Sequence, residues 1–300
     1  MGCPRGRLIS LVAATATAAV AVAASSAAGA GAPGLIVFSA NESGKFTSQL
    51  YSVQPSGDGL KQLTTGAVNA LDPAFSPSGS RLAFIRFGYG LYTMSPNGTA
   101  IKRLTTNGRD SYPAWSPDGK FIAFVRPFKT RWRVWIMPAS GGKQRVLAQS
   151  PPAGRPSWTS KGLLIPTGGD LIRVDTANGR VQKYYGADID AIWGLNSVTV
   201  SPAVSNLTYV GAREPVPGDM DCGDGPCQRF GLYLESLTAK KKVPHMILKD
   251  AGAAGFSPNG SQIVFSAGGG LVVRSIATGA MRSIETPNLT PTTGAPPTWR

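Results

Sequence analysis

Three residues of different chemistry stand at matching places in the chain, each directly before a proline. They are a carboxylate, a phenol and a guanidinium: Asp72, Tyr112 and Arg155. Groups of this kind recognise partners through ion pairs, hydrogen bonds and ring stacking. Four more residues of similar chemistry lie in segments of variable sequence: Arg86, Arg126, Trp193 and Arg213. We interpret these seven residues as candidates for a ligand-binding site.

Few residues offer the chemistry of a hydrolase. His245 is the only histidine, which disfavours clustered-histidine metal sites, and no G-x-S-x-G motif is present. We therefore expect no catalytic residue. The alternative is a calcium-dependent hydrolase or lactonase, in which Asp72 and either Asp188 or Asp190 share one ion, because calcium prefers several carboxylate oxygens.

An insertion at residues 211–231 holds a second group of acids. Asp219, Asp221 and Asp224 offer hard oxygen ligands for calcium. The EF-hand pattern is not met, because Gly223 occupies its fifth position and no glutamate follows at the twelfth. We expect no cofactor, with calcium at these three acids as the alternative.

The first thirty residues have the composition of a secretory signal peptide. Arg5 and Arg7 precede the uncharged run Leu8–Ala24, and small residues follow up to Ala30. The alternative is an uncleaved membrane anchor, for which this alanine-rich run is short. We expect export to the periplasm, the cell envelope or the medium, and a single domain over residues 31–300.

The cysteines have to be considered together with this expected export. Three cysteines exclude a disulfide-dense scaffold and a four-cysteine zinc module. In an oxidising compartment we expect Cys222 and Cys227 to form a local disulfide. The alternative is two free thiols.

The body of the chain repeats a short pattern. Phe75-Ser-Pro-Ser-Gly79, Trp115-Ser-Pro-Asp-Gly119 and Phe256-Ser-Pro-Asn-Gly260 each lead into a strand-like run, and degenerate copies contain Trp158 and Val200. With Trp299 at the chain end, these apolar anchors recur every 40 to 56 residues. Short strands at this period are typical of propeller blades, whereas a helical solenoid would need amphipathic helices that the sequence lacks.

Each repeat is expected to form four antiparallel strands joined by tight Ser-Pro-Asp-Gly turns. The second strand of the repeat recurs six times, but its N-terminal copy, around Phe38, has no first strand ahead of it. The segment Pro297–Arg300 matches the missing strand. We therefore expect an all-β, six-bladed β-propeller, closed by a C-terminal strand that joins the N-terminal blade. The alternative for residues 287–300 is a disordered tail.

These repeats resemble the TolB-like family of six-bladed propellers, which is related to the WD-repeat propellers. The resemblance covers about residues 35–300 and also rests on the endings Leu63-Thr64 and Leu104-Thr105. TolB proteins carry an α/β domain ahead of the propeller, and related peptidases carry a hydrolase domain. We expect neither here, because the first strand begins at residue 35 and no length is left for a hydrolase. The resemblance implies the fold and no particular activity.

The loops of such a ring fall into two sets, because strand direction alternates. The first–second and third–fourth connections of each blade are short and repetitive, and we call their side of the ring the turn end. The remaining loops differ between blades and hold the seven candidate residues; we call their side the variable end. Because ligand chemistry is freer to use variable loops, we expect this end to bind a protein or a cell-envelope glycan.

The basic excess of the chain, 30 Lys and Arg against 16 Asp and Glu, falls mostly at the turn end. Lys240, Lys241 and Lys242 belong to this excess and would fit an anionic surface. We favour the alternative that lysines along exposed edge strands prevent sheet-to-sheet aggregation. No basic and aromatic nucleic-acid module is visible, so we expect no nucleic-acid partner, and we expect a monomer.

Overall fold

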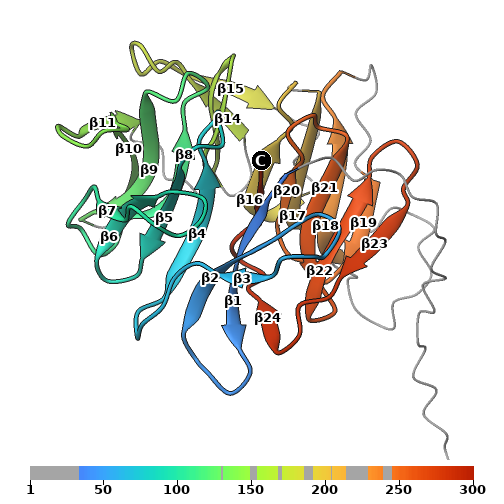
Figure 1. Cartoon of the computed structure of the whole chain (residues 1–300). Helices are drawn as coiled ribbons and strands as arrows, with labels where there is room; N and C mark the ends of the chain where they lie inside the picture. The colour runs from blue at the N-terminus through green and yellow to red at the C-terminus, as the bar shows by residue number, and fades with distance from the viewer. Residues whose placement is uncertain are drawn as a thin grey trace, which may run out of the picture. The chain divides into compact units, whose positions relative to one another are not determined.

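The computed structural model of the chain describes residues 34–129, 131–148, 154–167, 171–185, 192–203, 205–213, 229–238 and 245–300. These residues form 25 β-strands in six antiparallel sheets arranged as the blades of a ring (Figure 1). The described part of the chain contains no helix with the length and apolarity of a membrane span. The predicted all-β, six-bladed propeller is confirmed.

Blades 2 to 6 each consist of four strands that are consecutive in the chain. Blade 2 contains β4 (Ala70–Phe75), β5 (Leu82–Arg86), β6 (Gly90–Met94) and β7 (Lys102–Arg103). Blade 3 contains β8 (Ser111–Trp115), β9 (Phe121–Phe128), β10 (Arg131–Pro138) and β11 (Arg145–Ala148). Blade 4 contains β12 (Ser157–Thr159), β13 (Gly162–Pro166), β14 (Leu171–Val174) and β15 (Val181–Tyr185).

The last two of these blades follow the same plan. Blade 5 contains β16 (Ile192–Val200), β17 (Asn206–Arg213), β18 (Arg229–Ser236) and β19 (His245–Lys249). Blade 6 contains β20 (Ala254–Phe256), β21 (Gln262–Ala267), β22 (Gly270–Ser275) and β23 (Met281–Ile284).

Blade 1 is assembled from the two ends of the described chain. The N-terminal segment supplies β1 (Ile36–Glu42), β2 (Ser48–Val53) and β3 (Lys61–Gln62), and the C-terminal segment supplies β24 (Leu289–Pro291) and β25 (Thr298–Trp299). In β25, Trp299 pairs with Ile36 and Thr298 with Val37. This is the predicted closure, and the alternative of a disordered tail is wrong. The second piece, β24, pairs with Ala40–Glu42 and was not predicted (Figure 1).

The repeated Ser-Pro-x-Gly element forms the same turn in blades 2, 3 and 6. In blade 3 the backbone N–H of Ser116 donates to the carbonyl of Phe121 (2.9 Å), and the hydroxyl of Ser116 accepts from the Phe121 N–H (2.9 Å). The glycine of each copy has a positive φ, which is 70° at Gly119, and a side chain there would be strained. The turn chemistry predicted from the sequence is confirmed.

The apolar core lies between the blades. Each buried cluster contains side chains of two neighbouring blades, and the cluster between blades 6 and 1 includes Val264, Ile36 and Trp299. Trp299 is 6% exposed. A short C-terminal strand of two residues is therefore held by side-chain burial as well as by its two backbone pairs, and burial of an aromatic side chain is the larger contribution.

Candidate functional site

Asp72 and Tyr112 occupy the same position in blades 2 and 3, at a β-bulge where the first strand of each blade begins. The strand register shifts between Leu71 and Ala74 in blade 2, and between Ser111 and Ala114 in blade 3. Both residues have positive φ, 56° for Asp72 and 54° for Tyr112, a conformation that tyrosine rarely adopts. The bulge places the Asp72 carboxylate beside the next blade, where its Oδ2 accepts the Tyr112 N–H (3.2 Å).

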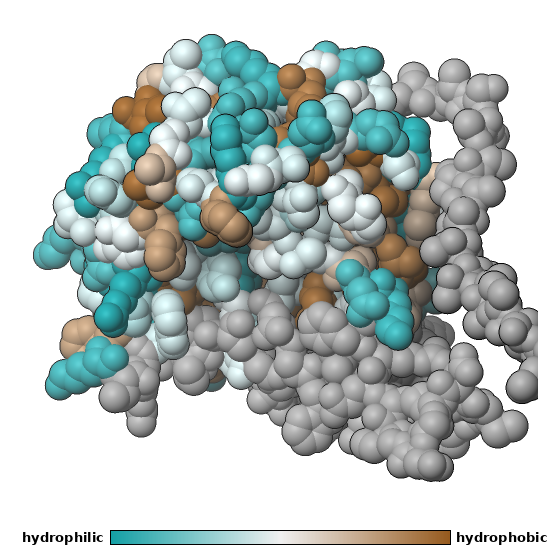
Figure 2. All heavy atoms as spheres, turned by 90° about the horizontal axis from the view of Figure 1, so that it is seen from below, coloured by the Kyte–Doolittle hydropathy of each residue, from teal (hydrophilic) through white to brown (hydrophobic). Residues whose placement is uncertain are grey.

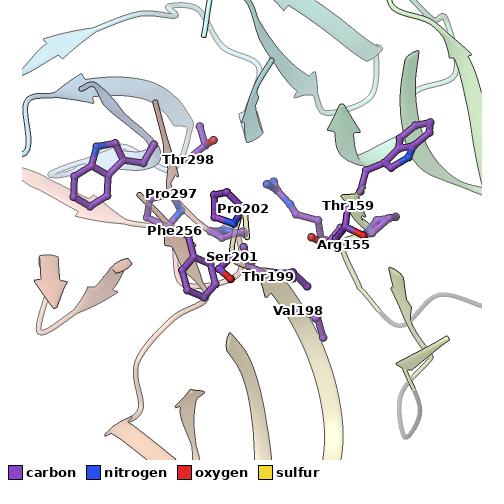
Figure 3. Close-up of a pocket in the computed structure, with 16 residues that line it drawn as sticks. Arg155, Thr159, Val198, Thr199, Ser201, Pro202, Phe256, Pro297 and Thr298 are labelled. Atoms are coloured by element: carbon purple, nitrogen blue, oxygen red, sulfur yellow. The ribbon is translucent and has the colours of Figure 1, made fainter. Parts of the chain in front are cut away.

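Arg155, the matching residue of blade 4, reaches past blade 3 to blade 2. Its Nη1 donates to the carbonyl of Pro73 (3.2 Å), and its Nη2 lies 3.6 Å from Oδ1 of Asp72. Figure 3 shows its side chain extended toward the middle of the ring. Among the described residues, the buried Nε and Nη2 atoms of Arg155 have no hydrogen-bond partner. The structure therefore brings the three residues singled out first together, and they contact one another.

Burial has the largest effect on the pKa values of Asp72, Tyr112 and Arg155. We call the two charged residues the Asp72–Arg155 pair. Burial raises the pKa of Asp72, although the Arg155 charge and the Tyr112 N–H act in the opposite direction. Burial likewise lowers the pKa of Arg155, against the attraction of Asp72. The pKa of Tyr112 is raised by burial and, secondarily, by the Asp72 charge. Desolvation is thus only partly offset by pairing.

Arg126 belongs to a second pair, within blade 3. Its Nε and Nη2 donate to the two carboxylate oxygens of Asp110 (2.6 and 2.9 Å), and its Nη1 donates to Gln144 (2.7 Å). The guanidinium also lies over the Trp135 ring, 4.9 Å from its centroid. Thr105 donates a further hydrogen bond to Asp110, which is buried. Most of the Arg126 donors are therefore occupied by the protein itself.

The remaining predicted site residues are less well defined. Arg86 is half-buried, 5.5 Å from the centroid of the Tyr92 ring. The backbones of Trp193 and Arg213 lie in the paired ends of β16 and β17, and their side chains are outside the described parts. The other residues singled out in the sequence lie wholly outside the described ranges: Asp188, Asp190, Asp219, Asp221, Asp224, Cys222, Cys227, Lys240, Lys241 and Lys242.

Among the described residues, no group of three or more His, Cys, Asp or Glu side chains is placed to hold a metal ion. At the one predicted calcium ligand that is described, both Asp72 oxygens face protein donors, Tyr112 and Arg155. A calcium ion there would have to displace Arg155.

Two hollows lie next to the Asp72–Arg155 pair. The first, about 250 Å³ and shown in Figure 3, is bordered by Arg155, Val198, Phe256 and Pro297, and therefore lies among blades 4, 5, 6 and 1. The second, about 400 Å³, lies at the variable end and is bordered by Asp72, Phe87, Arg109, Tyr112, Trp132 and Ala295. We call the second one the blade 2–3 hollow. It contains two of the predicted residues, Asp72 and Tyr112.

Aromatic side chains are exposed at the tips of the variable-end hairpins of blades 1 to 3. Phe87 is 64% exposed and Trp132 is 44% exposed, and both border the blade 2–3 hollow; Phe46, Tyr89 and Phe128 are also exposed. Figure 2 looks onto this end, since the β1–β2 loop lies at the lower edge of Figure 1, and shows apolar side chains between polar ones. Sequence reasoning missed these aromatics. The available signals were the glycine after Phe87 and the arginines on both sides of Trp132.

The fold and the site define a closed-ring β-propeller whose variable end carries a hollow. A family model described as a TolB beta propeller domain matches residues 12–191. The chain belongs to this family.

Solved structures agree with the fold. TolB from Acinetobacter baumannii superposes with a TM-score of 0.68 at 17% identity, over 89% of this chain and 66% of that chain. A chain of the nidogen/laminin complex gives a TM-score of 0.66 at 12% identity, over 89% of this chain and 98% of that chain. An oligogalacturonate lyase in complex with manganese gives 0.52 at 12% identity, over 79% and 70%. At these identities the likeness extends to the fold alone.

One curated relative matches in sequence. The "Uncharacterized peptidase YuxL" of Bacillus subtilis is 34% identical over 221 residues, which is 68% of this chain and 30% of that protein. The chain thus spans less than a third of that relative's length.

Proposed function

We propose that this chain is an exported, non-enzymatic binding module that recognises a protein partner through its variable end. The observation that carries the proposal is the blade 2–3 hollow, which is flanked by the exposed rings of Phe87 and Trp132. Large aromatic side chains beside a concave surface are the usual anchors of recognition sites.

The charged groups around the hollow support binding over catalysis. Asp72 is engaged by Tyr112 and Arg155, and Asp110 by Arg126. An acid–base mechanism requires a titratable group that can reach the substrate, whereas these two carboxylates are buried and paired with arginines. A structural neighbour from a complex of two proteins, nidogen and laminin, is consistent with protein recognition by this fold.

A photo-crosslinking experiment tests the proposal. p-Benzoylphenylalanine is placed at Phe87 or at Trp132, the chain is produced in cells, and irradiated adducts are identified by mass spectrometry. The matched control carries the same probe at Phe121, which is 40% exposed and lies at the turn end of blade 3, the blade of Trp132. One protein crosslinked from both variable-end positions and not from Phe121 is the expected result.

The crosslinked protein is then purified and its Kd is measured. Phe87→Ala and Trp132→Ala should each weaken binding about tenfold or more, whereas Phe121→Ala should change the Kd less than twofold. Equal crosslinking from both ends, or a Kd insensitive to Phe87 and Trp132, would reject the site. If the wild-type chain is retained on a glycan column and both alanine variants are not, the proposed partner is a glycan and not a protein.

Export has its own test. The intact chain is expressed with residues 1–30 in a secretion-competent bacterial host, and the N-terminus of the folded protein is determined by mass spectrometry. Cleavage after Ala28 or Ala30 is expected from the small residues at that point. A cytosolic product that retains residues 1–30 would contradict it.

A further inference from the structure

The surface around the blade 2–3 hollow carries unbalanced positive charge. Arg109 borders the hollow, Lys129 and Arg133 lie in the blade 3 hairpin beside it, and none of the three has a carboxylate oxygen within 4.0 Å among the described residues. The acids that line the hollow, Asp72 and Asp110, are already paired with arginines. A partner that docks here meets cations that have no carboxylate partner in the described parts of the chain.

The hairpin of blade 3 forms a raised wall on one side of the hollow. Beyond the pair Arg126–Arg133, which corresponds to Arg86–Gly90 of blade 2, it adds two further residue pairs ending at Phe128 and Arg131. At about 3.4 Å per residue this is an extension of roughly 7 Å. Its exposed side chains combine rings and cations, and the Arg133 guanidinium lies 3.9 Å from the centroid of the Phe128 ring.

The interior of the hollow is different from its rim. Four of its polar lining side chains already have partners within the protein. Besides the paired Asp72 and Asp110, Ser111 donates to the carbonyl of Val125 (3.5 Å), and Thr292 to that of Ser39 (3.2 Å). Leu71, Ile85 and Ala295 supply apolar lining. An apolar group loses little on entering, whereas a sugar ring would leave most of its hydroxyls unpaired.

We infer that the partner is an acidic protein segment, which places one large apolar side chain in the blade 2–3 hollow and Asp or Glu side chains against the surrounding cations. This inference rests on the proposed function and specifies the chemistry of the partner. The aromatic anchor supplies affinity, and the cations select acidic neighbours and accelerate encounter. An anionic membrane fits less well, since its flat surface would contact the projecting hairpin tips and leave the hollow between them unfilled.

A display selection tests the chemistry without knowledge of the natural partner. A library of random twelve-residue peptides is selected on the wild-type chain and depleted on the Phe87→Ala/Trp132→Ala variant. The enriched peptides should share one large apolar residue flanked by Asp or Glu. Neutral or basic consensus sequences, or no enrichment, would overturn the inference.

Charge reversal separates the rim from the hollow. Arg109→Glu/Lys129→Glu changes two exposed side chains, and Lys120→Glu is the matched control at the turn end of blade 3. The double variant should raise the Kd of the selected peptide about tenfold or more at low salt. The effect should be smaller at 0.5 M salt because the charges are screened. Lys120→Glu should change binding less than twofold. Thermal melting confirms that each variant is folded.

The outcomes distinguish this inference from the proposed function. If the crosslinked partner depends on Phe87 and Trp132 but not on Arg109 and Lys129, the binding function stands and the acidic segment is rejected. If neither pair matters, both fail. Sedimentation with phosphatidylglycerol vesicles is the third arm. Vesicle binding that Phe128→Ala and Lys129→Glu abolish, without peptide binding, would assign the surface to a membrane instead.

Discussion

Two buried arginine–aspartate pairs lie at the variable end, and they are built differently. Arg126 and Asp110 belong to one blade, share two short hydrogen bonds, and are supported by Gln144 and by the Trp135 ring. Arg155 and Asp72 belong to different blades and approach only to 3.6 Å, and two guanidinium nitrogens find no hydrogen-bond partner in the described parts of the chain. Strand pairing fixes distances within a blade, whereas the spacing between blades depends on side-chain packing. An ion pair that spans blades is therefore harder to satisfy.

The largest effect is expected from breaking the pair within blade 3. Arg126→Ala leaves Asp110 buried without its counter-charge, and should lower the free energy of unfolding by about 3–5 kcal/mol. Urea denaturation measures it, with Arg109→Ala, an exposed arginine of the same end, as the control with a change under about 0.5 kcal/mol. A loss no larger than that of the control would mean that the pair contributes nothing.

Removing both charges of each pair compares the two directly. Asp72→Asn/Arg155→Met should be within about 1 kcal/mol of wild type, because the loose pair gains little beyond its desolvation cost. Asparagine also tolerates the positive φ at this position. Asp110→Asn/Arg126→Met should lose about 2–4 kcal/mol, since several charge-assisted hydrogen bonds disappear.

The same denaturation assay decides this comparison. Equal losses for the two double variants would show that the cross-blade pair is as well satisfied as the other.

The pH dependence of the unfolding free energy should show that burial makes ionisation of Asp72 unfavourable. Burial raises its folded-state pKa above 3.8, so its share of stability is fully present below 3.8 and is lost as the pH rises through the folded pKa. Asp72→Asn has no such loss. Its unfolding free energy relative to wild type should therefore increase between about pH 3.5 and pH 7.

Asp118→Asn is the control with the opposite sign. The Ser116 hydroxyl lowers the pKa of the exposed Asp118 carboxyl below 3.8. The unfolding free energy of this variant should therefore fall relative to wild type as the pH rises from the lowered pKa through 3.8, and should stay level at higher pH. Parallel pH profiles for the two variants would contradict the electrostatic assignment.

The smallest effect is expected from calcium. Because Arg155 already faces the Asp72 carboxylate, adding calcium or a chelator should move the Tm by less than about 1 °C, as no ligand-linked stabilisation arises. A rise of several degrees that Asp72→Asn removes would place calcium on Asp72 and favour the hydrolase alternative. A rise that survives this substitution would assign calcium elsewhere, with Asp219, Asp221 and Asp224 as the first candidates.

Most of the fold could be predicted because the repeats carry their own turn chemistry. The Ser-Pro-x-Gly turns and the anchors before them define the blades, and the copy at Trp299 predicts the closure. The strand β24 was missed, since Leu289–Pro291 is too short for an alternating pattern and lies in a Pro- and Thr-rich segment. Its pairing with β1 depends on the distant N-terminal strand and leaves no local signal.

The convergence of three candidate residues could be predicted from the sequence, but their contacts could not. Asp72, Tyr112 and Arg155 precede equivalent prolines, and equivalent positions of a ring converge near its axis. Which of them bind one another depends on bulge geometry and on the reach of Arg155 past a whole blade, and sequence spacing does not report either. The sequence pattern also could not predict that Phe87 and Trp132 are exposed, because an aromatic residue at a strand end can lie in the core or on the surface.

The first blade has a consequence for the order in which the molecule can be made. Thr292 bonds to Ser39, 253 positions earlier in the chain, and Trp299 seals the same sheet. Of the described strands, β1 to β3 are synthesised first. The edge of β1 that pairs with β24 and β25 stays uncovered until almost the whole polypeptide has been made. Such distant pairing slows folding and leaves an unpaired edge exposed meanwhile. The ring therefore stays open until residues 289–299 have been made.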